Sequence, residues 1–151
     1  MTIHPGSPRL AVRAVIVQAG RLLLVNAYPG DRSDLWCAPG GGVEAGASLP
    51  DNLMREVQEE CGLRIAVGPP CLINEFHAPG GEFHQVEVFF RCTVLSGTIS
   101  DTWLDPARVV NRRRWASRHE MAGLRFKPDS LPDVAFARGM GYDPLEPILR
   151  P

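Results

Sequence analysis

An arginine and three glutamates lie close together in one stretch of this chain, at Arg55, Glu56, Glu59 and Glu60. If the stretch is helical, spacings of three and four residues place the acids on one flank, where they repel each other. Because that flank adjoins apolar positions, at least one acid would be driven toward protonation. A hard divalent cation removes this conflict, and magnesium prefers carboxylate and phosphate oxygens. From this helix alone, a magnesium site and a plain solvated acidic face are equally good interpretations.

A glycine run precedes this acidic stretch. Gly40, Gly41 and Gly42 follow Pro39, and glycines let the backbone approach a metal ion or a phosphate closely. A simple turn after the proline is the alternative interpretation. Taken together, the glycine run and the acids indicate a site for a metal ion and a phosphate.

The acids need a helix to hold them, and the sequence predicts one over residues 49–61. Ser48 and Asp51 resemble a capping box, and Pro50 is tolerated in a first turn. Gly62 ends the helix, as a glycine after the last turn commonly does. The apolar residues recur every four positions, at Leu49, Leu53, Val57 and Cys61.

Most of the remaining chain alternates between strand signals and turns. Hairpins and interspersed helices predict an α/β protein of the α+β type, with a mixed β-sheet between helices. Two further helices are expected, one from Ser117 to about residue 123 and one over 130–139. The expected strands cover residues 11–18, 21–27, 35–38, 64–67, 71–77, 85–95 and 109–116.

The 151 residues fit a single domain, with a loose arm at 1–10 and an irregular tail at about 140–151. The net charge of −1 gives no reason to expect nucleic acid or a membrane as a partner. The four cysteines form no metal-binding pair, and their apolar surroundings indicate free thiols in a reducing compartment. No apolar run could span a membrane, and the first residues lack a signal-peptide core, so we expect a cytoplasmic protein.

Residues 41–63, GGVEAGASLPDNLMREVQEECGL, resemble the Nudix box. All but one of its defining positions are in register: Gly41, Arg55, Glu56, Val57, Glu59, Glu60, Gly62 and Leu63. This register makes a coincidental acidic helix a poor explanation. The resemblance implies a Nudix-like α/β/α sandwich and a pyrophosphohydrolase that uses Mg²⁺, with Mn²⁺ as a substitute.

The resemblance also implies a role for each matching residue. Glu56, Glu59 and Glu60 would hold the metal ion together with the Gly40 carbonyl, and a glutamate outside the box, Glu82, is a candidate for a further ligand. Arg55 would orient the glutamates. Activated water would attack a phosphorus of the diphosphate. The catalytic set is thus Arg55, Glu56, Glu59 and Glu60, and the substrate-binding set is Gly41, Gly42 and Arg55.

One box position departs from the pattern, since Ala47 stands where the family has its first glutamate. An alanine side chain can neither bind a metal ion nor accept a hydrogen bond. Glu44 lies three residues earlier as an acid that could compensate. The departure predicts reduced activity, and it also favours the alternative of a non-catalytic Nudix-like module that senses a nucleotide.

The expected substrate is a small nucleoside diphosphate-linked compound, and a nucleoside triphosphate, an oxidised nucleotide and an ADP-ribose-like compound all stay open. A homodimer is an assembly that the sequence allows. Glu87 and Glu120 are alternative candidates for the further metal ligand, but the simpler interpretations are that Glu87 faces water on its strand and that Glu120 caps a helix. The arginines at 112–114 could bind phosphate, and the simpler interpretation is that they are the charged side chains of a solvated edge strand.

Overall fold

A mixed eight-stranded sheet forms the centre of the computed structural model, which describes residues 7–151. The strands are β1 (Arg9–Gln18), β2 (Arg21–Asn26), β3 (Trp36–Cys37), β4 (Gly40–Gly42), β5 (Arg64–Ala78), β6 (Phe83–Ser96), β7 (Arg113–Ser117) and β8 (Gly141–Pro147). The helices are α1 (Leu49–Cys61), α2 (Arg118–Met121) and α3 (Leu131–Phe136).

The strand order is β3-β2-β1-β6-β5-β8, with β4 paired to β1 and β7 paired to β2. Two pairings are parallel, β1 with β6 and β5 with β8, and the others are antiparallel. Strand β1 therefore contacts β2, β4 and β6 along its length. This arrangement confirms the mixed sheet.

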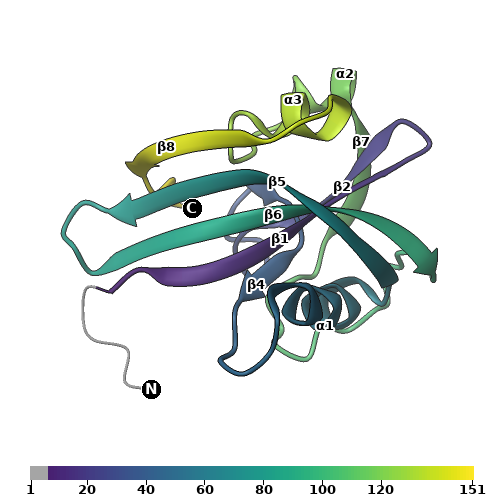
Figure 1. Ribbon diagram of the computed structural model, residues 1–151. Coiled ribbons are helices and arrows are strands. Elements are labelled where there is room, and N and C mark those ends of the chain that lie inside the picture. Colours follow the sequence, from purple (N-terminus) through teal and green to yellow (C-terminus); the bar gives the residue numbers. More distant parts are fainter. Residues whose placement is uncertain (1–6) are drawn as a thin grey trace.

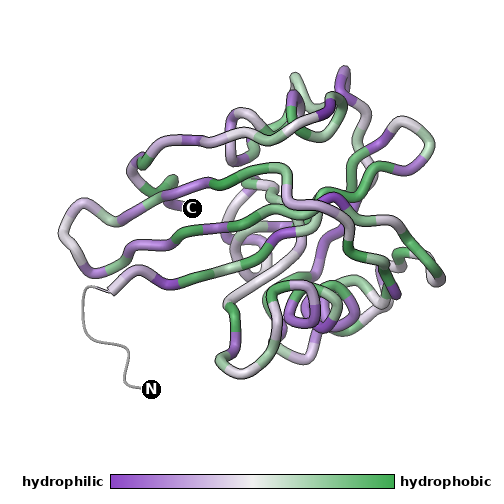
Figure 2. The backbone as a smooth tube through the Cα atoms, in the orientation of Figure 1, coloured by the Kyte–Doolittle hydropathy of each residue, from purple (hydrophilic) through white to green (hydrophobic). Residues whose placement is uncertain are grey.

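Two apolar cores lie on opposite faces of the sheet, because alternate residues of a strand point to opposite sides. Val12, Ala14 and Ile16 of β1 pack in the core that contains the apolar side of α1. Val15 packs in the other core, together with residues of α2 and α3. Figure 1 shows α1 on one side of the sheet and α2 and α3 on the other. The tube in Figure 2 is hydrophobic along the central strands. The α/β/α sandwich is thereby confirmed.

Helix α1 has the bounds that the sequence predicts. The Ser48 side chain accepts a hydrogen bond from the Asp51 amide at its first turn. At the other end, Gly62 adopts a left-handed conformation (φ 69°, ψ 20°), and its amide bonds back to the Gln58 carbonyl. A non-glycine residue would be strained in this conformation, which is why the glycine at position 62 predicts the end of the helix.

The termini differ from expectation. Residues 1–6 of the predicted arm lie outside the described part of the chain, and Arg9 and Leu10 already belong to β1. The tail at about 140–151 is not wholly irregular, since β8 pairs in parallel with β5 at the sheet edge. Pro144 misled the prediction, but an edge strand tolerates proline because one side of it needs no ladder partner.

Other predicted elements change in length. The strand expected at 109–116 begins later, since β7 covers Arg113–Ser117. The separate strands expected at 64–67 and 71–77 are one strand, β5, with register shifts around Pro70. The helix expected at 130–139 covers only Leu131–Phe136.

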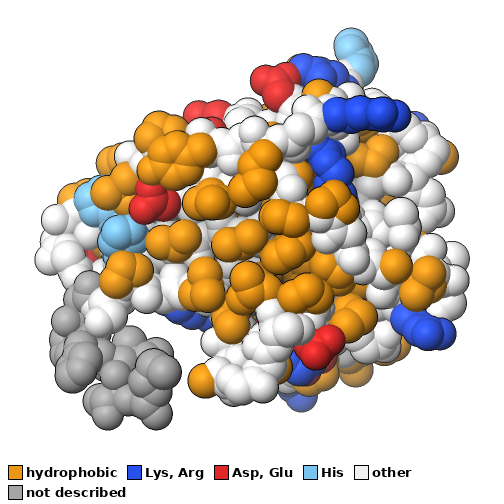
Figure 3. Space-filling model, viewed as in Figure 1, with side chains coloured by type: hydrophobic (Ala, Val, Ile, Leu, Met, Phe, Trp, Pro, Cys, Tyr) orange, Lys and Arg blue, Asp and Glu red, His pale blue; other side chains and the backbone are white. Residues whose placement is uncertain are grey.

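The face shown in Figure 3 carries hydrophobic side chains across its centre, over β5 and β6, with basic side chains near its upper edge. Among the described residues, no helix has the length and apolar character needed to cross a membrane.

Candidate active site

Arg55 contacts acidic side chains of α1 and of the loop before it. Its Nη1 lies 3.2 Å from a carboxylate oxygen of Glu56 and 3.6 Å from one of Glu59. The same nitrogen lies 3.7 Å from Glu44, whose side chain is 71% exposed. Because one guanidinium contacts several carboxylates, it reduces their mutual repulsion and limits their orientations.

Glu60 lies deeper than its neighbours, at 8% exposure. Its Oε2 accepts a hydrogen bond of 3.1 Å from the backbone amide of Gly40. Burial raises the pKa of Glu60 to about 8, against the opposing effects of Arg13 and the Gly40 amide. Burial also raises the pKa of Glu56, again against the effect of Arg55. Without a cation, this site therefore disfavours the ionised form of two of its acids.

These residues fit a hard divalent cation. Three carboxylates and nearby backbone oxygens are the donor set that magnesium prefers. Gly41 leaves space at the Glu56 carboxylate, because a Cβ on Gly41 would lie only 2.7 Å from it. Within residues 7–151, no three acidic, histidine or cysteine side chains already stand at metal-binding geometry. Glu56, Glu59 and Glu60 would hold the ion, with the Gly40 carbonyl as the backbone donor.

Asn52 is a buried member of this site that the sequence analysis missed. It is 1% exposed, and its Oδ1 accepts hydrogen bonds from Arg55 Nη2 (3.1 Å) and from the Glu44 amide (2.9 Å). Its Nδ2 donates to the carbonyls of Ser48 (2.9 Å) and Ala47 (3.2 Å). Asn52 thus ties the loop before α1 to the helix and holds Arg55. The available signal was its position four residues before Glu56, on the flank of the predicted helix that carries the acids.

Some predicted site residues lie elsewhere. Glu82 lies in the β5–β6 hairpin, is 59% exposed and contacts Arg150 at 3.5 Å, and in Figure 1 this hairpin is at the far end of the sheet from α1. Gly42 lies against Arg9, since a Cβ there would stand 2.3 Å from the guanidinium. Glu120 completes the capping box of α2, as expected.

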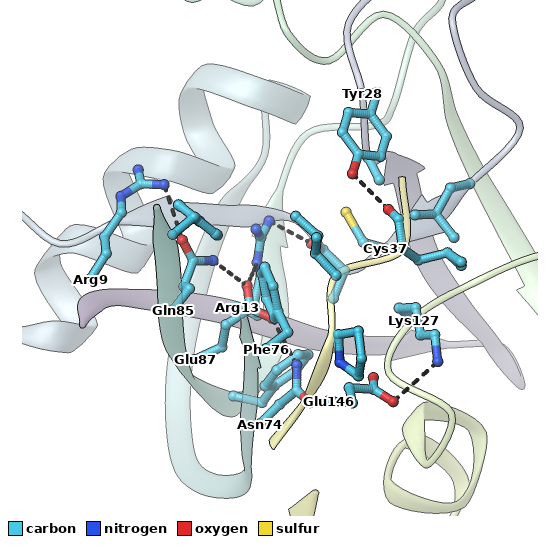
Figure 4. Close-up of a pocket in the computed structure, with 18 residues that line it drawn as sticks. Arg9, Arg13, Tyr28, Cys37, Asn74, Phe76, Gln85, Glu87, Lys127 and Glu146 are labelled. Carbon is cyan, nitrogen blue, oxygen red and sulfur yellow. Dashed lines mark hydrogen bonds and ion pairs between the residues drawn. The ribbon is translucent and has the colours of Figure 1, made fainter. Parts of the chain in front are cut away.

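A cavity of about 330 Å³ is lined by Arg13 and Ala38 among others, on the face of β1 opposite α1 (Figure 4). A polar network forms one side of it around Glu87, which is 4% exposed. The Glu87 carboxylate accepts hydrogen bonds from Arg13 Nε (2.6 Å), Gln85 Nε2 (3.0 Å) and Asn74 Nδ2 (3.1 Å). The expectation that Glu87 faces water was wrong, because its side chain is buried and its charge is paired with Arg13.

Arg13 links this cavity to the acids of α1. Its Nη1 donates to the carbonyls of Ala38 (3.2 Å) and Gly40 (3.3 Å), and the Gly40 amide donates to Glu60. The cavity and the acidic site are therefore connected through the Arg13 side chain and the Gly40 backbone. Cys37 also lines the cavity, but burial raises the pKa of its thiol to about 12, so it is no nucleophile there.

The arginines at 112–114 do not form a uniformly solvated strand. Arg113 is buried and donates to three backbone carbonyls, including that of Glu60 at 2.6 Å. This contact fixes the last turn of α1, so Arg113 supports the position of Glu60. Arg112 and Arg114 lie over the Trp36 ring, at 5.4 and 5.7 Å from its centroid.

Comparison with known proteins places this geometry in a family. Residues 7–135 match the family model of the NUDIX domain. A Bacillus subtilis (strain 168) protein named "Putative ADP-ribose pyrophosphatase YjhB" is 27% identical over 94 residues, which cover 60% of this chain and 44% of that protein. The aligned region thus spans less than half of the relative's length.

Solved structures share the fold. A UDP-X diphosphatase superposes with a TM-score of 0.72 at 21% identity, covering 91% of this chain and 68% of the other. An ADP-ribose pyrophosphatase from Streptococcus suis 89-1591 gives a TM-score of 0.67 at 22% identity, covering 91% and 100%. A NUDIX hydrolase from Nitrosomonas europaea gives 0.68 at 24% identity, covering 85% and 86%.

Proposed function

The chain belongs to the Nudix family, and on that basis we propose that it is a metal-dependent pyrophosphohydrolase of nucleoside diphosphate-linked compounds. The observation that carries the proposal is the position of Glu60. Its carboxylate is buried beside the glycine loop, within reach of the charges of Glu56 and Arg13. A buried acid that is unfavourable as an anion is well suited to binding a cation.

Magnesium, when bound, would stabilise negative charge on the phosphate oxygens and lower the pKa of the attacking water. The chain supplies the rest. Arg55 orients Glu56 and Glu59, and the lack of a side chain at Gly41 lets the Glu56 carboxylate lie against the backbone of the glycine loop. In the reaction, the water oxygen bonds to one phosphorus, a carboxylate accepts its proton, and the bridging oxygen leaves with the other phosphate.

The cavity lined by Arg13 and Ala38 would take the organic part of the substrate. It lies next to the proposed diphosphate site through Arg13 and the Gly40 backbone. Its lining combines aromatic and polar side chains, which suits a ring with polar edges. The names of relatives point to ADP-ribose and to UDP-linked compounds as first substrates to test. A cytoplasmic location and a homodimer remain predictions.

A second function is favoured by one observation, the alanine at position 47. Ala47 contributes only its backbone carbonyl to the site, as an acceptor for Asn52. With a weakened metal site, the same fold and cavity would bind a nucleotide without cutting it. Asn52 and Glu44 both contact Arg55, and these contacts favour retained, reduced catalysis.

The test is a hydrolysis screen over ADP-ribose, UDP-sugars and nucleoside triphosphates, with magnesium, with manganese, and with a chelator. Products are separated by chromatography, so that the bond cleaved is identified. We expect metal-dependent release of nucleoside monophosphates from at least one compound. Binding of these compounds with no metal-dependent cleavage of any of them would establish the sensor function instead.

A further inference from the structure

The outer wall of the cavity is formed by residues 146–149, which lie beyond the stretch that matches the family model. We call these residues the C-terminal wall. We propose that the C-terminal wall determines which organic group this protein accepts, and that this group is a nucleobase lying with one face against the wall. The proposal rests on the proposed function, because it assigns the organic part of the same substrate.

Three separate segments hold the C-terminal wall in place. Strand β8 pairs in parallel with β5 up to the partners His77 and Pro147, and the Ile148 amide then donates to the His77 carbonyl at 2.8 Å. The Tyr28 hydroxyl, from the loop after β2, donates to the Leu149 carbonyl at 2.7 Å. Arg125 Nη2 donates to the Arg150 carbonyl at 2.9 Å. The wall therefore has a defined position and can act in selection.

The two sides of the cavity differ in chemistry. The C-terminal wall presents the apolar residues Pro147, Ile148 and Leu149, with Glu146 paired to Lys127 at its start, whereas the network around Glu87 presents polar groups (Figure 4). An apolar side offers contact to the face of a flat ring, and a polar side offers hydrogen bonds to its edge. Purine and pyrimidine bases have both features, whereas a sugar has polar groups on all sides.

The size of the cavity agrees with one base. Small-molecule sites hold about 300 to 1,000 Å³, and this cavity, at about 330 Å³, is at the low end. A ring system fits such a volume, with the remaining sugar and phosphates extending toward Gly40. Lys127 and Glu146, which are 3.3 Å apart, form an ion pair at this wall.

The C-terminal wall is also separate from the acids of α1 that would bind the metal ion. No residue of the C-terminal wall contacts the acids of α1, and the two sites communicate through Arg13 and Gly40. A change in the wall should therefore alter recognition of the base and leave phosphate binding unchanged.

The test is calorimetric binding of adenosine monophosphate, uridine monophosphate and ribose 5-phosphate, which carries no base. Ile148→Trp places a large side chain into the cavity, and Ile148→Ala enlarges it. Leu145→Ala is the matched control, because Leu145 is an exposed apolar residue of β8 that does not line the cavity. Thermal melts confirm that each variant is folded.

We expect Ile148→Trp to weaken binding of at least one nucleotide about tenfold, which corresponds to about 1.4 kcal/mol. Ile148→Ala should change the preference between the two nucleotides, and neither variant should change ribose 5-phosphate binding. The proposal is overturned if Leu145→Ala has the same effect, if ribose 5-phosphate weakens equally, or if the nucleotides bind folded Ile148→Trp as they bind wild type. If Ile148→Trp weakens nucleotide binding as expected but wild type hydrolyses no diphosphate compound, the role of the C-terminal wall in base recognition is supported and the proposed hydrolase function fails.

Discussion

At the scale of single residues, the burial of Glu60 opposes the ionisation of its carboxylate, and nearby positive charge favours it. Glu60 is buried where a carboxylate is disfavoured, and Arg13 and the Gly40 amide offset only part of that cost. The same position keeps water away from the carboxylate, which strengthens its attraction to a cation. A residue that destabilises the metal-free protein is thus the residue best placed to bind metal.

The metal-free protein should lose stability as the pH rises through the range in which Glu60 ionises. The folded-state pKa of about 8 lies above the ordinary value of 4.5, so the folded protein holds the proton more tightly than the unfolded chain. Stability therefore falls between these two values and levels off above the higher one. Thermal melts in a chelator at several pH values measure this. Glu60→Gln should remove the dependence, and an unchanged slope in that variant would refute the assignment to Glu60.

Asn52→Ala should destabilise the protein by about 1 to 3 kcal/mol, because buried partners lose their hydrogen bonds. The groups affected are the Glu44 amide, the Ser48 carbonyl and one nitrogen of Arg55. Urea denaturation measures the change, with Gln58→Ala, on the exposed side of α1, as the control. Equal stability of the two variants would show that Asn52 does not hold the loop.

At the scale of elements, the ends of α1 determine where its acids lie. Gly62 ends the helix in a left-handed conformation, and Trp103 packs over it while its Nε1 donates to the Glu59 carbonyl at 2.8 Å. Arg113 holds the carbonyl of Glu60 in the same turn. The last turn, which carries two of the proposed metal ligands, is therefore fixed by residues far away in the sequence.

Gly62→Ala should cost more than Gly20→Ala, although both glycines have similar φ values of 69° and 74°. Each alanine is strained by about 1 kcal/mol at a positive φ. Only at Gly62 would the new Cβ also meet the Trp103 ring, at 2.8 Å, whereas nothing lies within 4 Å at Gly20. Denaturation of both variants gives the difference, and equal losses would show that Trp103 does not press on the helix end.

The pairing of β1 with β6 buries the ion pair of Arg13 and Glu87. Removing one partner leaves an uncompensated charge, so Glu87→Leu should cost about 3 kcal/mol or more. The double variant Arg13→Met with Glu87→Leu should recover much of that loss, since apolar replacements of buried pairs are often neutral. Denaturation of the single and double variants measures the coupling, and additive losses would contradict it.

At the scale of the whole molecule, the features that could be predicted from the sequence are those that depend on patterns of neighbouring residues. The bounds of α1 followed from Ser48, Gly62 and the four-residue repeat, and the mixed sheet followed from the hairpins and strand signals. The family followed from the register of the box. Each of these depends on residues close together in the chain.

Features that depend on distant pairing were missed. Strand β8 forms because β5 offers an edge, and nothing within residues 141–147 indicates this. Glu87 seemed to face water because its partner Arg13 lies 74 positions away. One signal was available: a lone basic residue and a lone acidic residue, each within an apolar strand, require partners and could have been paired with each other.

The most direct test of the metal-dependent hydrolysis is a magnesium titration of turnover on the best substrate from the screen. It compares wild type, Glu60→Gln and the control Asp51→Asn, which changes an exposed acid on the same helix. We expect wild type and Asp51→Asn to show the same saturable magnesium dependence, and Glu60→Gln to lose at least about a hundredfold in kcat/KM, or about 2.7 kcal/mol of transition-state stabilisation. Turnover that needs no metal, or that survives Glu60→Gln unchanged, would contradict the account.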